Sequence, residues 1–365
     1  MPPPPPSPSA PASHHLRLWW RRRGRAGAVG ATFAVALLAA ALLLALSSYA
    51  SIVFPASSGR RGPALVGLTL VRRASEKGAH FYNWNKVKIR YCDGASFSGD
   101  VKDELQNGSR FFFRGQRIWE AVMNELVVKG LRNAKQAFLT GCSAGGLATY
   151  IHCDSFRALL PKDSRVKCLA DGGFFLDVED ISGRRTMHSF YSDVVRLQGL
   201  RERFSHCNSN MDAGQCFFPR EVVKHIVNPV FVLNPAYDAW QVQHALAPEA
   251  SDPQHSWLDC RLDISKCSPK QLGILQRFRK ELHDAISEAK QKRGWGFYIN
   301  SCFVHCQSLN SLTWHSPTSP RVNNKSIAEA VGDWFFDRRE VKEIDCEYPC
   351  NPTCHNLVFA RPFKI

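Results

Sequence analysis

A short apolar run, a glycine-rich turn and a helix-periodic run follow one another in residues 136–160, and this feature constrains the fold more than any other. The run QAFLT (residues 136–140) precedes the turn, and LATYIHCDSFRALL follows it with apolar residues at helical spacing. Residues 141–146 (GCSAGG) contain the pattern G-x-S-x-G. In this setting a serine sits on a strained turn with its Oγ held out at the start of the helix. The pattern predicts a nucleophilic Ser143, and a Gly/Ser-rich turn without chemistry is the alternative.

A serine nucleophile needs a base and an acid that orients the base. In α/β folds with this turn they follow in the order serine, acid, histidine, each in a loop after a later strand. Residues 229–233 (PVFVL) are typical of a buried strand, and Asp238 lies in the loop beyond it. Residues 295–300 (WGFYIN) predict another strand, which His305 follows closely. We therefore expect Asp238 to orient His305, and His305 to be the base.

Other residues compete for these two roles. Asp171 follows the apolar run 166–170, but it comes one strand after the serine rather than several, which favours Asp238. The competing histidines lie in polar, loop-like sequence, where a histidine is more often a solvated surface residue than a base. They are His206, His244, His255, His315 and His355.

Thirteen cysteines in 365 residues indicate an oxidising compartment in which disulfides persist. Cys302 and Cys306 flank the loop of His305 and are expected to fix it by joining different partners. The Cys/His groups lack the paired spacings of zinc sites, so we expect disulfides rather than metal ligands, and no cofactor. Spacing alone favours small loops closed by Cys207/Cys216 and Cys260/Cys267.

The amino-terminal segment has a different character. Residues 1–25 are predicted to be a disordered cytoplasmic tail, and five arginines at its end precede an uncharged apolar run that starts at residue 26. That run is long enough to cross a bilayer, so residues 26–54 are predicted to be a signal anchor or transmembrane helix. A signal peptide cleaved near residues 47–51 (SSYAS) is the alternative. Either way the bulk of the chain is expected to be lumenal or extracellular.

The chain is strongly basic, with a formal net charge of +15. Five of these charges belong to the arginines ahead of the apolar run, and the rest are spread along the remainder. Such a surface favours polyanions, among which nucleic acid is the weakest candidate for a secreted protein. Two N-glycosylation sequons, at Asn107 and Asn324, agree with lumenal placement.

Several long strings of the sequence closely resemble plant pectin acetylesterases. They are residues 81–100, 113–115, 141–147, 234–241 and 300–307, and the likeness extends over about residues 81–355. That family is related to the α/β-hydrolases and includes the animal Wnt deacylase Notum. Its plant members remove acetyl groups from homogalacturonan in the cell wall.

The resemblance implies an α/β-hydrolase-like (SGNH/Notum-like) fold, a mostly parallel sheet between helices with disulfide-stabilised loops. It implies the triad Ser143, Asp238 and His305, and the backbone N–H of Ala144 as one oxyanion-hole donor. Acetylated pectin, an acidic polysaccharide, is the implied partner, and the secretory pathway and cell wall are the implied location. Parallel strands are expected near residues 86–91, 136–140, 166–170, 229–233 and 295–300.

One departure from the family pattern concerns its first segment. The family carries a strand that ends in a Gly-Gly-Gly-Trp-Cys turn, whose N–H groups complete the oxyanion hole, and residues 60–80 contain no such motif. We therefore expect residues 55–80 to be a linker in place of that segment, the hydrolase domain to span 81–365, and a strand beside the nucleophile to be missing. Loss of one oxyanion donor typically costs about 100- to 1,000-fold in rate.

The same deletion accounts for the odd cysteine count, with Cys92 or Cys142 as the unpaired residue, and the carboxyl-terminal cysteines are expected to hold the tail to the His305 loop. These cysteines are Cys346, Cys350 and Cys354. Three functions stay open. They are a pectin acetylesterase, a catalytically impaired protein that binds pectin, and a Notum-like carboxylesterase acting on another acylated substrate.

Overall fold

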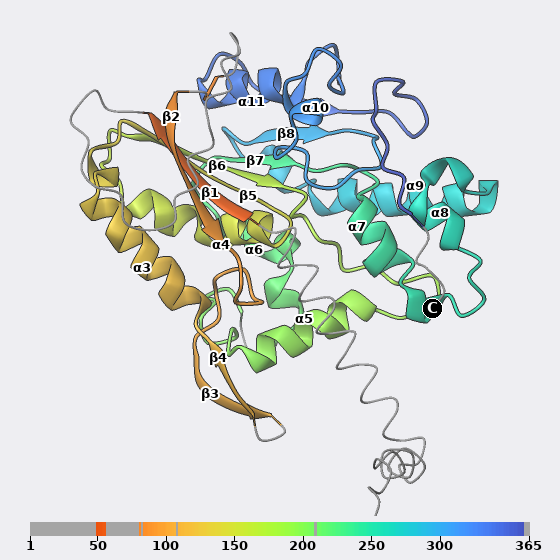
Figure 1. Cartoon of the computed structure of the whole chain (residues 1–365), viewed down its shortest axis with the longest axis horizontal. Coiled ribbons are helices and arrows are strands. Elements are labelled where there is room, and N and C mark those ends of the chain that lie inside the picture. The colour runs from red at the N-terminus through yellow and green to blue at the C-terminus, as the bar shows by residue number, and fades with distance from the viewer. Residues whose placement is uncertain (1–48, 56–79, 82, 107–108, 208–209, 361–365) are drawn as a thin grey trace, which may run out of the picture. The chain divides into compact units, whose positions relative to one another are not determined.

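A seven-stranded sheet with the order β2-β1-β5-β6-β7-β8-β9 forms the centre of the fold (Figure 1). The computed structural model describes residues 49–55, 80–81, 83–106, 109–207 and 210–360. From β5 onward every pair of neighbouring strands is parallel. The strands are β1 (Tyr49–Pro55), β2 (Trp84–Arg90), β5 (Gln136–Cys142), β6 (Arg165–Asp171), β7 (Val230–Leu233), β8 (Gly296–Ile299) and β9 (Lys342–Ile344).

The prediction of five strands with a common direction is confirmed. β1 is antiparallel to both β2 and β5, so β2 runs the same way as β5. Strands β5 to β8 are buried at almost every position, as expected for a parallel sheet covered on both faces. Their carboxyl ends meet at one edge, from which the chain enters the loops of Ser143, Asp238 and His305.

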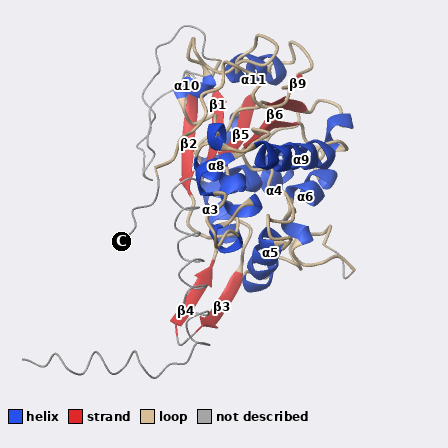
Figure 2. Ribbon diagram, turned by 90° about the vertical axis from the view of Figure 1, so that its right-hand side faces the viewer, coloured by secondary structure: helices blue, strands red, loops and turns tan. Residues whose placement is uncertain are grey.

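Helices cover both faces of the sheet, as predicted. Figure 1 shows α11 on one side and α3 and α4 on the other. The longer helices are α3 (Gly115–Val128), α4 (Ala144–Ala158), α5 (Thr186–Leu197), α6 (Pro219–His225), α9 (Pro269–Ala285) and α11 (Ile327–Phe335). The short ones are α7 (Ala239–Gln241), α8 (Leu258–Leu262) and α10 (Ser311–Trp314). Strands β3 (Val101–Gln106) and β4 (Ser109–Phe113) form a hairpin that projects from the body (Figures 1 and 2).

Helix α11 shows why these sequences pack as they do. Ser326 and Glu329 form a capping box that fixes its first turn, and Ile327, Val331 and Phe335 recur at helical spacing on its apolar face. This face packs on a cluster of strand residues that includes Phe138 from β5, and these helix residues are almost fully buried. The cluster joins α11 to one face of the sheet and leaves the carboxyl edge to the loops.

Strand β1 corrects two expectations. Residues 49–54 were expected inside an apolar helix, and the place beside β5 was expected to be empty. The segment YASIVFP instead pairs with β5, with Tyr49 opposite Cys142. Its β-branched Ile52 and Val53 and its aromatic Tyr49 favour an extended strand. The folded unit therefore begins before residue 81.

The rest of the predicted anchor, residues 26–48, and most of the predicted linker, residues 56–79, lie outside the described residues, as does the tail 1–25. Within the described ranges, no helix combines the length and the apolar character needed to cross a bilayer.

Twelve of the cysteines form six disulfides, which confirms the prediction of disulfides rather than thiolate ligands. Cys92 is free and exposed, and Cys142 is paired. Cys302 and Cys306 join different partners, and Cys354 ties the carboxyl-terminal tail to the His305 loop, both as predicted. The same expectation was wrong for Cys346 and Cys350, which pair with each other and not with that loop. The pairs are Cys142–Cys306, Cys153–Cys168, Cys207–Cys216, Cys260–Cys267, Cys302–Cys354 and Cys346–Cys350.

Candidate active site

Ser143 lies on a strained turn between β5 and α4. Its backbone has φ 59° and ψ −124°, a conformation that a non-glycine residue adopts only when its surroundings impose it. Its N–H donates to the carbonyl of Asp171 at 2.8 Å, which ties the turn to β6. A Cβ on Gly146 would lie 2.9 Å from the Cα of Gly173, so the first turn of α4 packs backbone to backbone on the loop after β6. The small residues of the motif therefore make the turn sterically feasible.

His305 and Asp238 form a buried pair at the same edge of the sheet. The Nδ1 of His305 lies 2.8 Å from Oδ2 of Asp238, and the Asp238 side chain is 1% exposed. The other carboxylate oxygen, Oδ1, accepts a hydrogen bond from the N–H of Gln241 at 2.9 Å because Asp238 caps α7. Both oxygens are thus occupied, which fixes the carboxylate and, through it, the imidazole.

The electrostatics of this pair favour a charged imidazole. Burial alone would lower the pKa of His305, but the charge and hydrogen bond of Asp238, with the more distant charge of Asp171, raise it above its ordinary value. The Nε2 of His305 and the Oγ of Ser143 are both buried and have no hydrogen-bond partner among the described residues. Hydrogen bonds between catalytic groups often form only when substrate is bound.

Asp171, the competing acid, has a different role. Its Oδ2 accepts hydrogen bonds from the N–H and the Oγ of Ser308, both at 2.6 Å, and not from His305. Burial raises the pKa of Asp171 in spite of these hydrogen bonds. Asp171 therefore anchors the segment that follows His305, while Asp238 contacts the imidazole itself.

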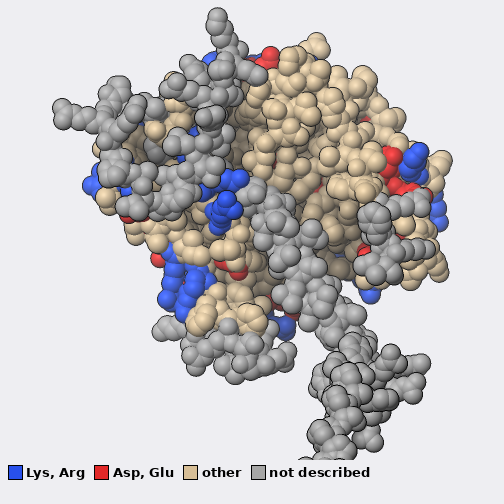
Figure 3. All heavy atoms as spheres, viewed as in Figure 1, with Lys and Arg blue, Asp and Glu red and all other residues tan. Residues whose placement is uncertain are grey.

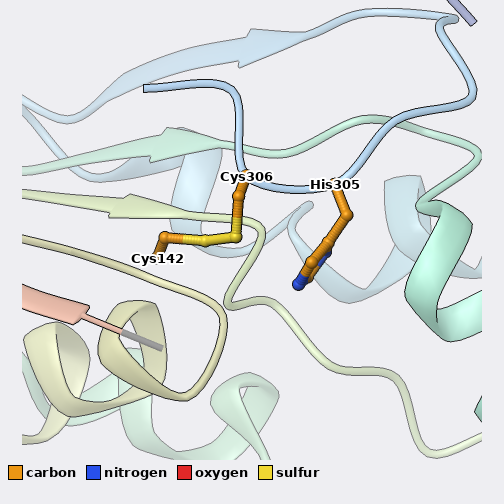
Figure 4. A group of neighbouring side chains, drawn as sticks. All are labelled: Cys142, His305 and Cys306. Carbon is orange, nitrogen blue, oxygen red and sulfur yellow. A yellow bond between two sulfur atoms is a disulfide. The ribbon is translucent and has the colours of Figure 1, made fainter. Parts of the chain in front are cut away.

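A disulfide and a glycine set the position of His305. Figure 4 shows the Cys142–Cys306 bond joining the end of β5 to the loop that carries His305. A Cβ on Gly172, whose φ is +54°, would lie 3.2 Å from the imidazole Nδ1 and 3.5 Å from Oδ2 of Asp238. The two sulfurs lie close enough to His305 to suggest a metal site. Joined in a disulfide, they are not the thiolates that bind zinc.

The other histidines differ in their surroundings. His206 contacts the carbonyl of Cys216 at 3.0 Å, His355 contacts that of Thr318 at 2.7 Å, and His255 is exposed. His244 is different, because its ring lies 4.9 Å from that of Trp240, which in turn stacks on His305 at 6.3 Å. Sequence reasoning missed this proximity. The signal was present in the spacing, since Trp240 and His244 lie four residues apart directly after Asp238.

A serine on a strained strand-to-helix turn and a buried Asp–His pair at the same edge of a mostly parallel sheet are the arrangement of α/β serine hydrolases. Within that class, residues 54–355 match the family model described as Pectinacetylesterase. The chain belongs to the pectinacetylesterase family, as its motifs predicted.

Individual relatives agree with this assignment. Pectin acetylesterase 5 of Arabidopsis thaliana is 56% identical over 281 residues, which cover 77% of this chain and 66% of that protein. Pectin acetylesterase 4 of the same plant is 53% identical, over 75% of this chain and 67% of that protein. This chain thus spans about two thirds of the length of these curated relatives.

More distant relatives share the fold. The palmitoleoyl-protein carboxylesterase NOTUM of Mus musculus is 26% identical over 80% of this chain and 59% of that protein. The crystal structure of the Wnt deacylase Notum from Drosophila (crystal form II) superposes with a TM-score of 0.59, covering 75% of each chain at 20% identity. The predicted Notum-like sheet and helices are therefore confirmed.

Proposed function

We propose that this protein hydrolyses acetyl esters of pectin through Ser143, His305 and Asp238. The observation that carries the proposal is the buried contact of 2.8 Å between His305 and Asp238, at the sheet edge where Ser143 precedes α4. The family and the relatives named pectin acetylesterase supply the substrate class.

In the proposed reaction each of these groups has one role. His305 takes the proton of the Ser143 hydroxyl at Nε2 as Oγ attacks the acetyl carbonyl carbon. The sugar oxygen leaves with that proton, and an acetyl ester of Ser143 remains. His305 then removes a proton from water, which attacks the ester. His305 passes that proton to Oγ of Ser143 as the bond between Oγ and the acetyl carbon breaks and the acetyl group leaves as acetic acid, which ionises to acetate. Asp238 holds the imidazole in one orientation and stabilises its charged form throughout.

The oxyanion that develops in each step needs N–H donors. Ala144 is the first residue of α4, and the first N–H groups of a helix have no acceptor within it. The N–H of Ala144 is therefore one donor, next to the nucleophile and at the positive end of the helix dipole.

A second candidate function is a catalytically impaired protein that binds pectin. Tyr49, at the start of β1, pairs with Cys142 at the site edge, so β1 ends at the opposite edge of the sheet. In the family pattern the strand beside the nucleophile leads into the oxyanion turn, and here residues 60–80 lack the Gly-Gly-Gly-Trp motif. Both observations favour a slow or inactive enzyme.

The basic surface gives this second candidate its ligand. Figure 3 shows lysine and arginine side chains in separate groups around the rim of the displayed face rather than in one patch. Such a distribution suits weak, multiple contacts with a partly de-esterified pectin, and added salt would weaken them. A Notum-like carboxylesterase on another acylated substrate is the third candidate, supported only by the distant relatives.

The cell wall, reached through the secretory pathway, is the location we propose. Six disulfides fit an oxidising compartment. Asn324 is exposed and is a proposed glycosylation site, whereas Asn107 lies outside the described residues. Retention at the membrane by residues 26–46 is part of the same proposal, on the apolar sequence alone.

Acetate release tests the proposal. The full chain and its Ser143→Ala variant are incubated with acetylated pectin, and free acetate and pectin binding are measured. We expect acetate from the parent and none from the variant, with binding unchanged. Salt-sensitive binding without acetate release from either protein would instead support the impaired, pectin-binding function.

A further inference from the structure

The helix turn that begins at Asp238 carries aromatic side chains toward His305. Asp238 caps α7, which continues into the π-helical turn Val242–Leu246. Trp240 and His244 lie four residues apart and share one face, with ring centroids 4.9 Å apart. The neighbouring residues Ala239, Gln241 and Val242 are buried, whereas Trp240 is half-buried and His244 is exposed. The face that carries Trp240 and His244 is therefore accessible.

Trp240 lies between the proposed base and an apolar cluster. Its ring stacks on His305 at 6.3 Å and 30°, and it meets Phe175 edge to face at 5.3 Å. Phe175 belongs to a buried cluster that also contains Leu147, and Trp240 packs against this cluster from outside. Leu147 lies one turn beyond Ser143 on α4, and the N–H of Leu147 donates to the carbonyl of Ser143 at 3.0 Å. The indole therefore packs on the same apolar cluster as Leu147, four residues after the nucleophile, and next to His305.

An indole in this position restricts what Ser143 can bind. An acyl group on Ser143 must place its chain in apolar surroundings, because an alkyl chain gains free energy by leaving water. The large, rigid ring of Trp240 already fills such surroundings next to His305 and Phe175. A methyl group needs little of that space, whereas each further methylene must displace protein atoms from a packed region.

His244 lies beside Trp240 on the same face of the turn. Surrounding protein on one side of the imidazole, with the charges of His305 and Arg261, lowers the pKa of His244 to about 4 although its outer edge is open to solvent. The lowered pKa favours the neutral ring, which lies against Trp240 and extends its aromatic surface.

We propose that Trp240, backed by His244, is the wall that restricts the acyl group accepted by Ser143 to a short chain such as acetyl. This inference rests on the proposed esterase function and adds a residue that determines acyl specificity. It also gives a physical reason why a chain of this fold would differ in acyl preference from relatives whose name specifies a palmitoleoyl group.

An acyl-length series tests the wall. The kcat/KM values for 4-nitrophenyl acetate, butyrate and octanoate are measured for the full chain and for Trp240→Ala, Trp240→Phe and His244→Ala. One methylene in an apolar pocket changes discrimination by about 10- to 200-fold. We expect Trp240→Ala to raise the octanoate-to-acetate ratio at least about tenfold, Trp240→Phe to change it little, and His244→Ala to raise it less than Trp240→Ala.

The matched control is Trp314→Ala, which removes a half-buried indole from the cluster around α11 and should leave the acyl profile unchanged. An equal loss for all three esters in Trp240→Ala would contradict the wall, because it would mean that the indole only positions His305. A selective loss on acetylated pectin with an unchanged acyl profile would also contradict it, because the indole would then contact the sugar.

A binding measurement separates this inference from the proposed function. If the parent hydrolyses none of the esters, the esterase proposal fails. Calorimetric titration with octanoate then tests whether Trp240 excludes long acyl chains, independently of catalysis. Binding to Trp240→Ala that exceeds binding to the parent at least about tenfold would support it, and equal binding would overturn it.

Discussion

Cys142 and Cys306 are joined by a disulfide with Cα atoms 5.5 Å apart, and each lies one residue from a proposed catalytic side chain. Cys142 precedes Ser143, and Cys306 follows His305. The bond closes a segment with a sequence separation of 164, and it is the most direct covalent link between the nucleophile turn and the base.

Removing this bond should cost both stability and activity. Loss of a native disulfide typically costs about 2–5 kcal/mol, and more for long loops than for short ones. We expect the Cys142→Ala, Cys306→Ala double variant to melt at a lower temperature. We also expect it to lose more of its kcat than a double variant that lacks a disulfide remote from the site. Cys260→Ala with Cys267→Ala, which opens a loop of sequence separation 7, is the control. Equal effects of the two double variants on kcat would contradict a positioning role.

The two buried aspartates should respond differently to loss of charge. Asp238→Asn removes the charge beside His305 and disturbs the hydrogen bond that orients it, so we expect kcat to fall by about 10⁴-fold. Asp171→Asn acts on the Ser308 contacts and should retain most of the activity. Steady-state kinetics of the two variants tests this assignment, and a larger loss in Asp171→Asn would reverse it.

The pH dependence of activity follows from the pKa of His305. The base acts in its neutral form, and its pKa is raised, chiefly by Asp238 against the opposing effect of burial. The acid limb of the kcat/KM profile should therefore lie above the ordinary histidine value of about 6.5. Asp171→Asn removes a smaller raising effect and should move that limb to lower pH. An acid limb below the ordinary value, or no movement, would contradict this origin of the limb.

Asp93 should make stability depend on pH. Burial, partly offset by hydrogen bonds from the N–H groups of Phe97 and Ala95, raises the pKa of Asp93 to about 6. The folded state then binds this proton more tightly than the unfolded state, so the contribution is favourable below about pH 4 and is lost as pH rises to 6. Relative to the parent, Asp93→Asn should gain about 2 kcal/mol between pH 4 and pH 7. Urea unfolding at both values measures this, and an unchanged difference would refute it.

The strands that lead to the candidate residues could be predicted from the sequence, but the whole sheet could not. Ser143, Asp238 and His305 each follow a short apolar run that is bounded by turn residues, which favours a buried strand, so their common edge was predictable. Strand β1 was not, because YASIVFP follows an uncharged apolar run, and continuous apolar sequence does not distinguish strand from helix. Contacts between residues far apart in the chain could not be predicted from the sequence either. Ser308 bonds Asp171 across 137 residues, and Cys306 pairs with Cys142 across 164.

Removing strand β1 should reduce the solubility and the stability of the folded chain. A chain that begins at Ala56 lacks β1 and leaves the facing edges of β2 and β5 unpaired, whereas a chain that begins at Ser47 keeps them covered. Open edges of this kind favour aggregation. We expect the longer chain to be soluble with a cooperative melt and the shorter one to aggregate. Equal solubility and melting temperature would show that β1 adds nothing to the sheet.

Covalent trapping of Ser143 would show whether this serine is an activated nucleophile. The full chain is treated with a fluorophosphonate, which reacts with an activated serine, and peptide mass spectrometry locates the adduct. We expect modification of Ser143, and we expect the reaction to be slower by orders of magnitude in His305→Gln. Modification of another residue, or none on the folded chain, would contradict a Ser143–His305–Asp238 esterase.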